Sequence, residues 1–497
     1  MSDDQGMDKY IEQFQAVLGL RDQGRLAEAI GLCRKYVDSR PPIGDGWNLV
    51  ASAAQQMGDL STAIKAARLY VADDEQDPSR KLFLAGILGE SPNGAEAASL
   101  ANKNIGFYEN VADLNFLTGL LNARSGQFDV ADTYLRMAIE CDSGHGRSWE
   151  YLVNISGTGT DSEDFAAMER VVKEDRYPSP EDKLAMQYAL GKACHDSGRY
   201  EDAWKYFSEG ARQFTEANPV DLRALESYLA RLKVQFSREF VTSFQGTGSV
   251  SARPIFIVGM PRSGTSLVER LLGSLEDVQP GGKMTLIRLA TLPIKNMEPG
   301  EMAVFFAEVG KVSSGLMDPW KNLADNYLAL LNEYFGPGGH VTDKQLGSQL
   351  FMGAIKLMFP NAKVLYVRRH PIDTAFSCFR VRFSQGNQWS YSFENIAHYT
   401  RMYEDIMAHW MKLFPESIME VQYESLINDP KRQTKRILEH CELLGEVDTD
   451  KFYLHDSSVA TASMAEVRKP IYTTSLGAWE NYKEWLEPYQ PLFESGG

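Results

Sequence analysis

Polar and apolar residues recur with a helical period through the first half of the chain, and the pattern itself repeats. Stretches with a glycine followed five residues later by an alanine begin 34 residues apart, or at twice that spacing. They are "GRLAEAI", "GDLSTAI" and "GQFDVAD", and the alanines keep the step at Ala29, Ala63, Ala97 and Ala131. A further copy, from Gly198 with Ala203, follows the irregular stretch "NISGTGTDSED". The pattern predicts five or six pairs of antiparallel helices, with small residues where two helices approach closely.

The helical pattern ends at "GTGSVSARP", a stretch rich in glycine and serine that is typical of a connector. The next residues, "IFIVG", form a short apolar run that predicts a buried strand of a parallel sheet. We therefore predict two domains. Residues 1–240 form an all-α repeat domain, and residues 252–497 form a three-layer, P-loop-like α/β domain around a parallel sheet.

The stretch "GMPRSGTS", Gly259 to Ser266, lies between that strand and a helix predicted from "SLVERLLGSL". It resembles the nucleotide-binding loop G-x-x-x-x-G-K-[ST], except that Thr265 occupies the lysine position. Gly259 and Gly264 allow backbone conformations that turn successive N–H groups toward an anion, and the helix dipole adds to their effect. The sequence therefore predicts an anion site in this loop.

The next comparable strand, "KVLYVRRHP", ends in Arg368 and Arg369. A metal-dependent nucleotide hydrolase would carry an aspartate there, whereas two guanidinium groups suit a terminal phosphate directly. Together with Arg262, the cation of the loop, they favour a nucleotide that has an extra phosphate away from its reacting end. The competing enzyme class is a magnesium-dependent kinase or hydrolase of nucleoside triphosphates with a degenerate loop.

Composition narrows the choice of partners. The formal charge of -16 disfavours long-range attraction to nucleic acid or to an anionic membrane, so local cations must hold any anionic ligand. The five cysteines and eight histidines show no C-x-x-C or H-E-x-x-H spacing, so we predict neither a disulfide framework nor a metal site. The acidic N-terminus is unlike a signal peptide, and no apolar run is long enough to span a bilayer, so we expect a cytoplasmic protein.

These motifs amount to two family resemblances. The 34-residue period resembles the tetratricopeptide repeat. "PRSGTS" after a strand, followed about a hundred residues later by "VRRHPIDTAFS", resembles the sulfotransferase family, whose donor is 3′-phosphoadenosine-5′-phosphosulfate (PAPS). The whole layout is similar to bacterial tetratricopeptide-repeat sulfotransferases and, more distantly, to protein-tyrosine sulfotransferases. The resemblance implies transfer of a sulfuryl group from PAPS to a hydroxyl or similar acceptor, without a metal.

The resemblance also implies roles for particular residues. The 5′-phosphosulfate group would contact the loop residues, with Arg262 on the sulfuryl and bridging oxygens; these are Arg262, Ser263, Gly264, Thr265 and Ser266. The 3′-phosphate site would be an arginine and a serine eight residues later, which fall on Arg369 and Ser377. The remaining positions are Tyr423 beside the adenine, Ser463 and Lys469 near the nucleotide, and Lys344 on the departing oxygen.

The resemblance breaks at the general base. Relatives with repeats carry a glutamate shortly after the loop helix, and here "LEDVQPGGKMT" places Lys283 at that position. The cytosolic branch uses a histidine two residues beyond the lysine that matches Lys344, and here that residue is Leu346. A protonated lysine cannot accept a proton, and only strong burial or adjacent positive charge would lower its pKa enough.

Three explanations stay open. The base comes from elsewhere, with Asp343, His370 and Glu298 as candidates. Alternatively, the acceptor ionises by itself or is an amine. Finally, the domain binds the nucleotide without turning it over, as a catalytically impaired domain on a repeat scaffold for protein interaction. The repeat array is either a spacer or self-association surface, or a groove for a partner polypeptide. The acceptor is a peptide or protein, a saccharide or a small metabolite.

Overall fold

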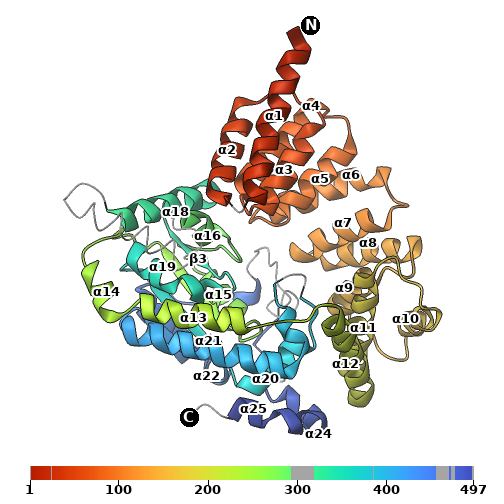
Figure 1. The fold of residues 1–497 in the computed structure, drawn as a ribbon. Helices are drawn as coiled ribbons and strands as arrows, with labels where there is room; N and C mark the ends of the chain where they lie inside the picture. The colour runs from red at the N-terminus through yellow and green to blue at the C-terminus, as the bar shows by residue number, and fades with distance from the viewer. Residues whose placement is uncertain are drawn as a thin grey trace. The chain divides into compact units, whose positions relative to one another are not determined.

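The computed structural model describes residues 2–23, 25–292, 318–383, 386–454, 469–471 and 476–494. Ser463 and Glu298, which the sequence analysis singled out, lie outside the described residues. The chain divides into two compact units: Met1–Glu109 with Met284–Pro337, and Asn110–Lys283 with Gly338–Gly497 (Figure 1). These units divide the chain elsewhere than the sequence-predicted boundary between residues 240 and 252.

The first unit is helical. Its helices form the hairpins α1/α2, α3/α4 and α5/α6, and their buried alanines Ala29, Ala63 and Ala97 confirm the predicted close approaches (Figure 1). Gly58 turns between α3 and α4 with φ 83°, a conformation that favours glycine. The helices are α1 (Ser2–Asp22), α2 (Leu26–Ser39), α3 (Gly46–Gln56), α4 (Leu60–Asp73), α5 (Pro78–Leu88), α6 (Gly94–Asn104), α16 (Leu286–Ala290) and α18 (Pro319–Phe335).

The second unit begins with the later repeat helices. Ala131, which lies on the 34-residue step, is fully buried, and so is Ala203 of the further copy, which is offset from that step by four residues. α9 packs against α11, and α10 also packs against α11, so the pairing is irregular after the stretch "NISGTGTDSED". These helices are α7 (Ala112–Arg124), α8 (Phe128–Cys141), α9 (Gly146–Ser156), α10 (Glu163–Glu174), α11 (Pro180–Asp196), α12 (Tyr200–Ala217), α13 (Arg223–Gln235) and α14 (Arg238–Ser243).

The same unit contains a five-stranded sheet in the order β2-β3-β1-β4-β5, and every neighbouring pair is parallel, which confirms the predicted parallel sheet. Its long strands are apolar because both faces are covered. The strands are β1 (Pro254–Gly259), β2 (Val278–Pro280), β3 (His340–Asp343), β4 (Lys363–Arg368) and β5 (Ile418–Gln422).

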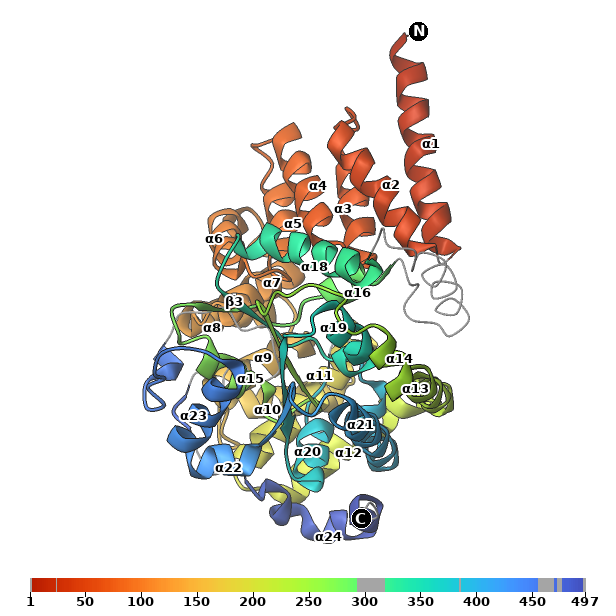
Figure 2. The ribbon, with the colours of Figure 1, turned by 90° about the vertical axis from the view of Figure 1, so that its left-hand side faces the viewer.

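Alternate residues of each strand face two helical layers. On one face, Leu365 and Val421 pack with apolar residues of α15, α22 and α23. On the other face, the ring of Tyr366 stacks on Tyr403 of α21, with centroids 6.1 Å apart. Figure 2 shows α22 and α23 on the side of the sheet away from α21. The remaining helices are α15 (Thr265–Leu272), α19 (Met352–Met358), α20 (Pro371–Phe379), α21 (Phe393–Leu413), α22 (Tyr423–Asn428), α23 (Pro430–Cys441), α24 (Lys483–Leu486) and α25 (Pro491–Glu494).

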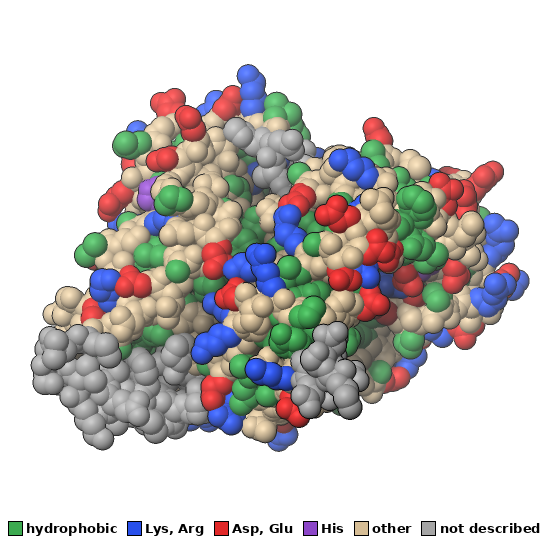
Figure 3. All heavy atoms as spheres, turned by 90° about the horizontal axis from the view of Figure 1, so that it is seen from above, with side chains coloured by type: hydrophobic (Ala, Val, Ile, Leu, Met, Phe, Trp, Pro, Cys, Tyr) green, Lys and Arg blue, Asp and Glu red, His purple; other side chains and the backbone are tan. Residues whose placement is uncertain are grey.

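Basic and acidic side chains are interspersed over the face drawn in Figure 3. Attraction of an anion to this chain therefore depends on local groups of cations. None of the helices that the structure describes is long and apolar enough to cross a membrane.

Candidate functional site

Functional groups gather at one edge of the sheet, in the second unit. Parallel strands end at the same edge, and neighbouring strands lie about 4.8 Å apart, so the residues that follow the strands come together. In spatial order, the strands are followed by Lys283, Lys344, the loop 260–264, Arg369 and Tyr423.

The loop after β1 has the backbone of an anion cradle. Arg262 and Gly264 both have positive φ, at 67° and 105°, and such alternation turns successive N–H groups toward one point. A Cβ on Gly259 would lie 2.5 Å from the oxygen of Val367 and 2.6 Å from Ser263 Oγ, so only glycine fits there. Ser263 Oγ is buried and has no hydrogen-bond partner among the described residues. This hydroxyl and the loop amides suit an anionic ligand.

Three residues that the sequence assigned to the two ends of one nucleotide lie together. Arg262 donates from Nε to Ser377 Oγ at 3.0 Å, and Arg369 donates from Nη1 to the backbone oxygen of Arg262 at 3.3 Å. Ser377 lies on α20, which begins just after Arg369 and brings the serine back toward the loop. Both Ser377 and Arg369 are buried. Arg262 and Arg369 are therefore on the same edge of the sheet.

Arg368 departs from the expectation that it pairs with Arg369 on a phosphate. Its guanidinium donates to Glu404 Oε1 of α21, from Nε at 3.1 Å and from Nη2 at 2.8 Å. Arg368 is the last residue of β4, and successive residues of a strand point to opposite faces. Of the two arginines, Arg369 alone contacts the loop.

The ring of Tyr423 packs against the loop at Gly264. The guanidinium carbon of Arg369 lies 4.9 Å from the centroid of the Tyr423 ring, which is a cation–π contact. A Cβ on Gly264 would come within 2.8 Å of Tyr423 Cε2, and closer still to Cδ2. The glycine thus lets the tyrosine ring lie directly against the loop. Asp373 lies 3.7 Å from Arg369 Nη2 and partly balances its charge.

Lys344 is almost fully buried, and its Nζ forms an ion pair with Glu269 Oε2 at 3.2 Å. Glu269 Oε1 also accepts hydrogen bonds from Gly282 N at 2.9 Å and from Thr342 Oγ1 at 3.0 Å. Sequence reasoning missed Glu269. The signal that could have found it is the position of two charged residues, Glu269 and Arg270, in the helix that follows the loop. This helix, α15, is short and packs closely on the sheet, so both side chains are buried.

The proposed substitutes for the general base are placed differently. Asp343 is fully buried, and its Oδ1 accepts from Gln345 N at 3.1 Å. His370 is exposed, and its ring stacks on Trp479 with centroids 6.4 Å apart. Lys469 is also exposed. Among the described residues, no three His, Cys, Asp or Glu side chains are grouped as metal ligands.

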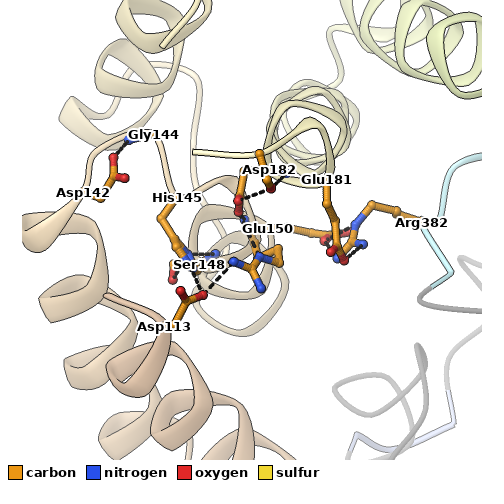
Figure 4. A network of polar contacts seen from close by, with 11 residues as sticks. Asp113, Asp142, Gly144, His145, Ser148, Glu150, Glu181, Asp182 and Arg382 are labelled. Atoms are coloured by element: carbon orange, nitrogen blue, oxygen red, sulfur yellow. Dashed lines mark hydrogen bonds and ion pairs between the residues drawn. The ribbon is translucent and has the colours of Figure 1, made fainter. Parts of the chain in front are cut away.

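A buried polar network fixes the repeat helices of this unit to the segment after α20 (Figure 4). Arg382 Nη2 lies 2.7 Å from Glu150 Oε2, and both side chains are about one-tenth exposed. Arg382 Nη1 also pairs with Glu181 at 2.9 Å. Nearby, Arg380 contacts His195 of α11, 3.0 Å between Nη1 and Nε2. The helix that carries Ser377 is thus followed directly by residues that bind α9 and α11.

The arrangement defines a class of protein. A parallel sheet with a glycine-bearing loop between its central strand and the following helix is an α/β domain of the phosphate-loop type. Residues 254–445 match the model of the sulfotransferase family.

The chain is also similar to individual proteins and solved structures. The chain is 29% identical over 450 residues to an uncharacterized protein of Aquifex aeolicus (strain VF5), covering 89% of this chain and 58% of that relative. Among solved structures, the sulfotransferase domain of the Synechococcus PCC 7002 olefin synthase is 17% identical, with a TM-score of 0.28, covering 48% of this chain and 97% of that domain. Sulfotransferase STF9 of Mycobacterium avium is 14% identical, with a TM-score of 0.28, covering 61% of this chain and 91% of that chain.

Proposed function

We propose that this chain transfers a sulfuryl group from PAPS to a hydroxyl or similar acceptor, and that its helical repeats select or present the acceptor. The observation that carries the proposal is the contact of Arg262 with both Ser377 and Arg369. A donor with phosphate groups at its 3′ and 5′ positions needs cations for both ends within one molecule's reach. These residues supply them.

The residues fit the donor. Ser263 Oγ, the loop amides and Arg262 bind the 5′-phosphosulfate, and Arg369 with Ser377 binds the 3′-phosphate. Arg262 and Arg369 are like charges in close proximity, and a bound phosphate relieves their repulsion. PAPS, when bound, supplies the sulfuryl group on a phosphate–sulfate anhydride bond.

Lys344 has the role of stabilising the departing phosphate oxygen. Glu269 holds the buried Lys344 side chain in place through its ion pair, because burial of an unpaired ammonium is costly. The loop amides and Arg262 stabilise negative charge on the donor as the bond breaks. Tyr423 lines the adenine side through its contact with Arg369.

A second function is a domain that binds the nucleotide without turnover and serves as a scaffold for protein interaction. Lys283 favours it, because this lysine occupies the position where repeat-bearing relatives carry the carboxylate base. A metal-dependent kinase or hydrolase is less favoured, since β4 ends in Arg368 rather than in an aspartate.

Calorimetry with 3′,5′-ADP, the nucleotide product, tests the donor site. Arg369→Ala should weaken binding by roughly 10- to 100-fold, because a charge-assisted hydrogen bond contributes about 1.5–3 kcal/mol. Arg368→Ala is the matched control, since it removes the neighbouring guanidinium that pairs with Glu404. Absence of binding, or equal effects of the two variants, would contradict the proposal. Transfer from ³⁵S-labelled PAPS into a cell extract, with identification of the product, then tests turnover and reveals the acceptor.

A further inference from the structure

Lys283 is fixed beside Lys344 by the backbone that extends past β2 and β3. Gly281 N donates to the oxygen of Thr342 at 3.1 Å, and Lys344 N donates to the oxygen of Gly282 at 2.9 Å. Gly282 N donates to Glu269 Oε1, so the loop helix also anchors this segment. Gly282 has φ 68°, a turn that places the next residue past the strand end.

Lys283 is also accessible. It follows β2, which lies two strand spacings, about 10 Å, from the strand β1 that precedes the phosphate loop. Lys283 is exposed to solvent, whereas Lys344 is buried and paired with Glu269.

We propose that Lys283, as a neutral amine, is the general base that accepts the proton of the acceptor hydroxyl. This inference rests on the proposed function. The acceptor oxygen forms a bond to sulfur while the bond between sulfur and the bridging phosphate oxygen breaks. The proton moves to Lys283 Nζ, which becomes an ammonium, and 3′,5′-ADP leaves. The ammonium then returns its proton to water.

The surroundings of Lys283 raise the fraction of its side chain that is a neutral amine. The pKa of Lys283 is lowered to about 8 by loss of hydration first, and then by repulsion from Lys344 and from Arg124 at the end of α7. Glu269 opposes them in part. The exposure of Lys283 limits the loss of hydration and screens the two neighbouring cations, but both effects still lower its pKa. At pH 7 about a tenth of such amines are neutral, against about three in ten thousand at the ordinary pKa of 10.5.

The first experiment measures the titration of Lys283 without any acceptor. The full-length protein is labelled with a trace of acetic anhydride between pH 6 and 11, and acetylation of Lys283 is followed by mass spectrometry. The labelling midpoint should lie near pH 8 and should rise in Arg124→Gln, which removes a neighbouring cation. A midpoint near that of free lysine would overturn the proposal.

The second experiment compares variants in transfer from ³⁵S-labelled PAPS to the cell extract. Lys283→Arg, which stays protonated, should lose about 10²- to 10⁴-fold in rate. Lys283→Glu, which restores the carboxylate of the relatives, should retain transfer. The wild-type rate should rise with pH through about 8, because the neutral form is the active one, whereas the Lys283→Glu rate should rise in the acidic range instead.

Calorimetry with 3′,5′-ADP separates the two levels of inference. All Lys283 variants should bind this nucleotide with affinity close to wild type. If they bind it and Lys283→Arg also transfers at the wild-type rate, a positive charge suffices at this position and the base proposal is wrong while the donor site stands. If wild type binds the nucleotide but transfers nothing and Lys283→Glu gains transfer, the wild-type domain binds the nucleotide without turnover and Lys283 is not a base. If wild type does not bind 3′,5′-ADP, the proposed function itself fails.

Discussion

The contact between Gly264 and Tyr423 gives a quantitative test of the donor site. In Gly264→Ala the new Cβ would lie 2.8 Å or less from two carbons of the tyrosine ring, and real Cβ atoms essentially never approach within 3.0 Å. The ring is buried, so it must shift, and its contact with Arg369 is then lost. Loss of the cation–π contact costs about 0.5–2 kcal/mol, and holding an alanine at φ 105° costs about 1–3 kcal/mol.

These two costs act on the geometry that binds the nucleotide. Their sum, about 1.5–5 kcal/mol, corresponds to weaker binding by roughly 10-fold or more if the variant relaxes fully in its free state. The assay is calorimetry with 3′,5′-ADP at fixed salt, together with thermal unfolding of the same samples. Both the affinity and the unfolding temperature should fall.

Gly198→Ala is the matched control. Gly198 has φ 75° in the turn between α11 and α12, and a Cβ there would meet no atom within 4 Å. This variant therefore carries backbone strain without a clash, so it should lower the unfolding temperature and leave nucleotide binding unchanged. Folded Gly264→Ala protein that binds 3′,5′-ADP as well as wild type would refute the assignment of Tyr423 and the loop to one site.

Two further predictions concern buried ion pairs. Glu269→Gln leaves Lys344 without its carboxylate partner, which should lower the free energy of unfolding by about 3–5 kcal/mol. The same variant should lower the acetylation midpoint of Lys283 below that of wild type, because Glu269 raises the pKa of Lys283. Arg382→Met should lower the free energy of unfolding by a similar amount, because it leaves Glu150 unpaired. Adding Glu150→Leu to that variant should restore most of the lost stability. A double variant as unstable as the single variant would contradict this prediction. Burial already raises the pKa of Glu150 above its ordinary value. Arg382→Met should therefore regain stability at a pH below the ordinary pKa of glutamate, where the Glu150 carboxyl is protonated in both the folded and the unfolded state. Its stability should fall again as the pH rises.

Local pattern was sufficient for the elements and for placing Arg262 and Arg369 at one edge of the sheet. The alanine step marked close helix contacts because only a small side chain fits where two helices cross, and Ala63 is fully buried. The run "IFIVG" marked a strand covered on both faces, and β1 is buried along its whole length. Arg262 and Arg369 were recognisable because a parallel sheet brings the residues after its strands to one edge.

Pairings between distant segments could not be read from the sequence. Glu150 and Arg382 are 232 positions apart, and no periodicity links an acidic residue on a repeat helix to an arginine after α20. This pair joins α9 to the segment after α20 within one compact unit, whereas the end of the helical pattern and the connector had predicted a boundary between residues 240 and 252. The opposite directions of Arg368 and Arg369 were in principle predictable from the alternation of side chains along a strand.

The charges around Lys283 explain why a lysine at this position needs basic neighbours. A bound donor brings several negative charges to the carboxyl edge, and those charges stabilise an ammonium and so raise the pKa of any nearby amine. Lys344 and Arg124 act in the opposite direction and lower the pKa of Lys283. For a glutamate base, the two effects have opposite consequences. The negative charges of the donor would raise the pKa of the carboxyl and make it a better base, whereas basic neighbours would lower that pKa and make it a weaker base. A site that replaces glutamate with lysine therefore keeps a usable base only where cations such as Arg124 stand close by.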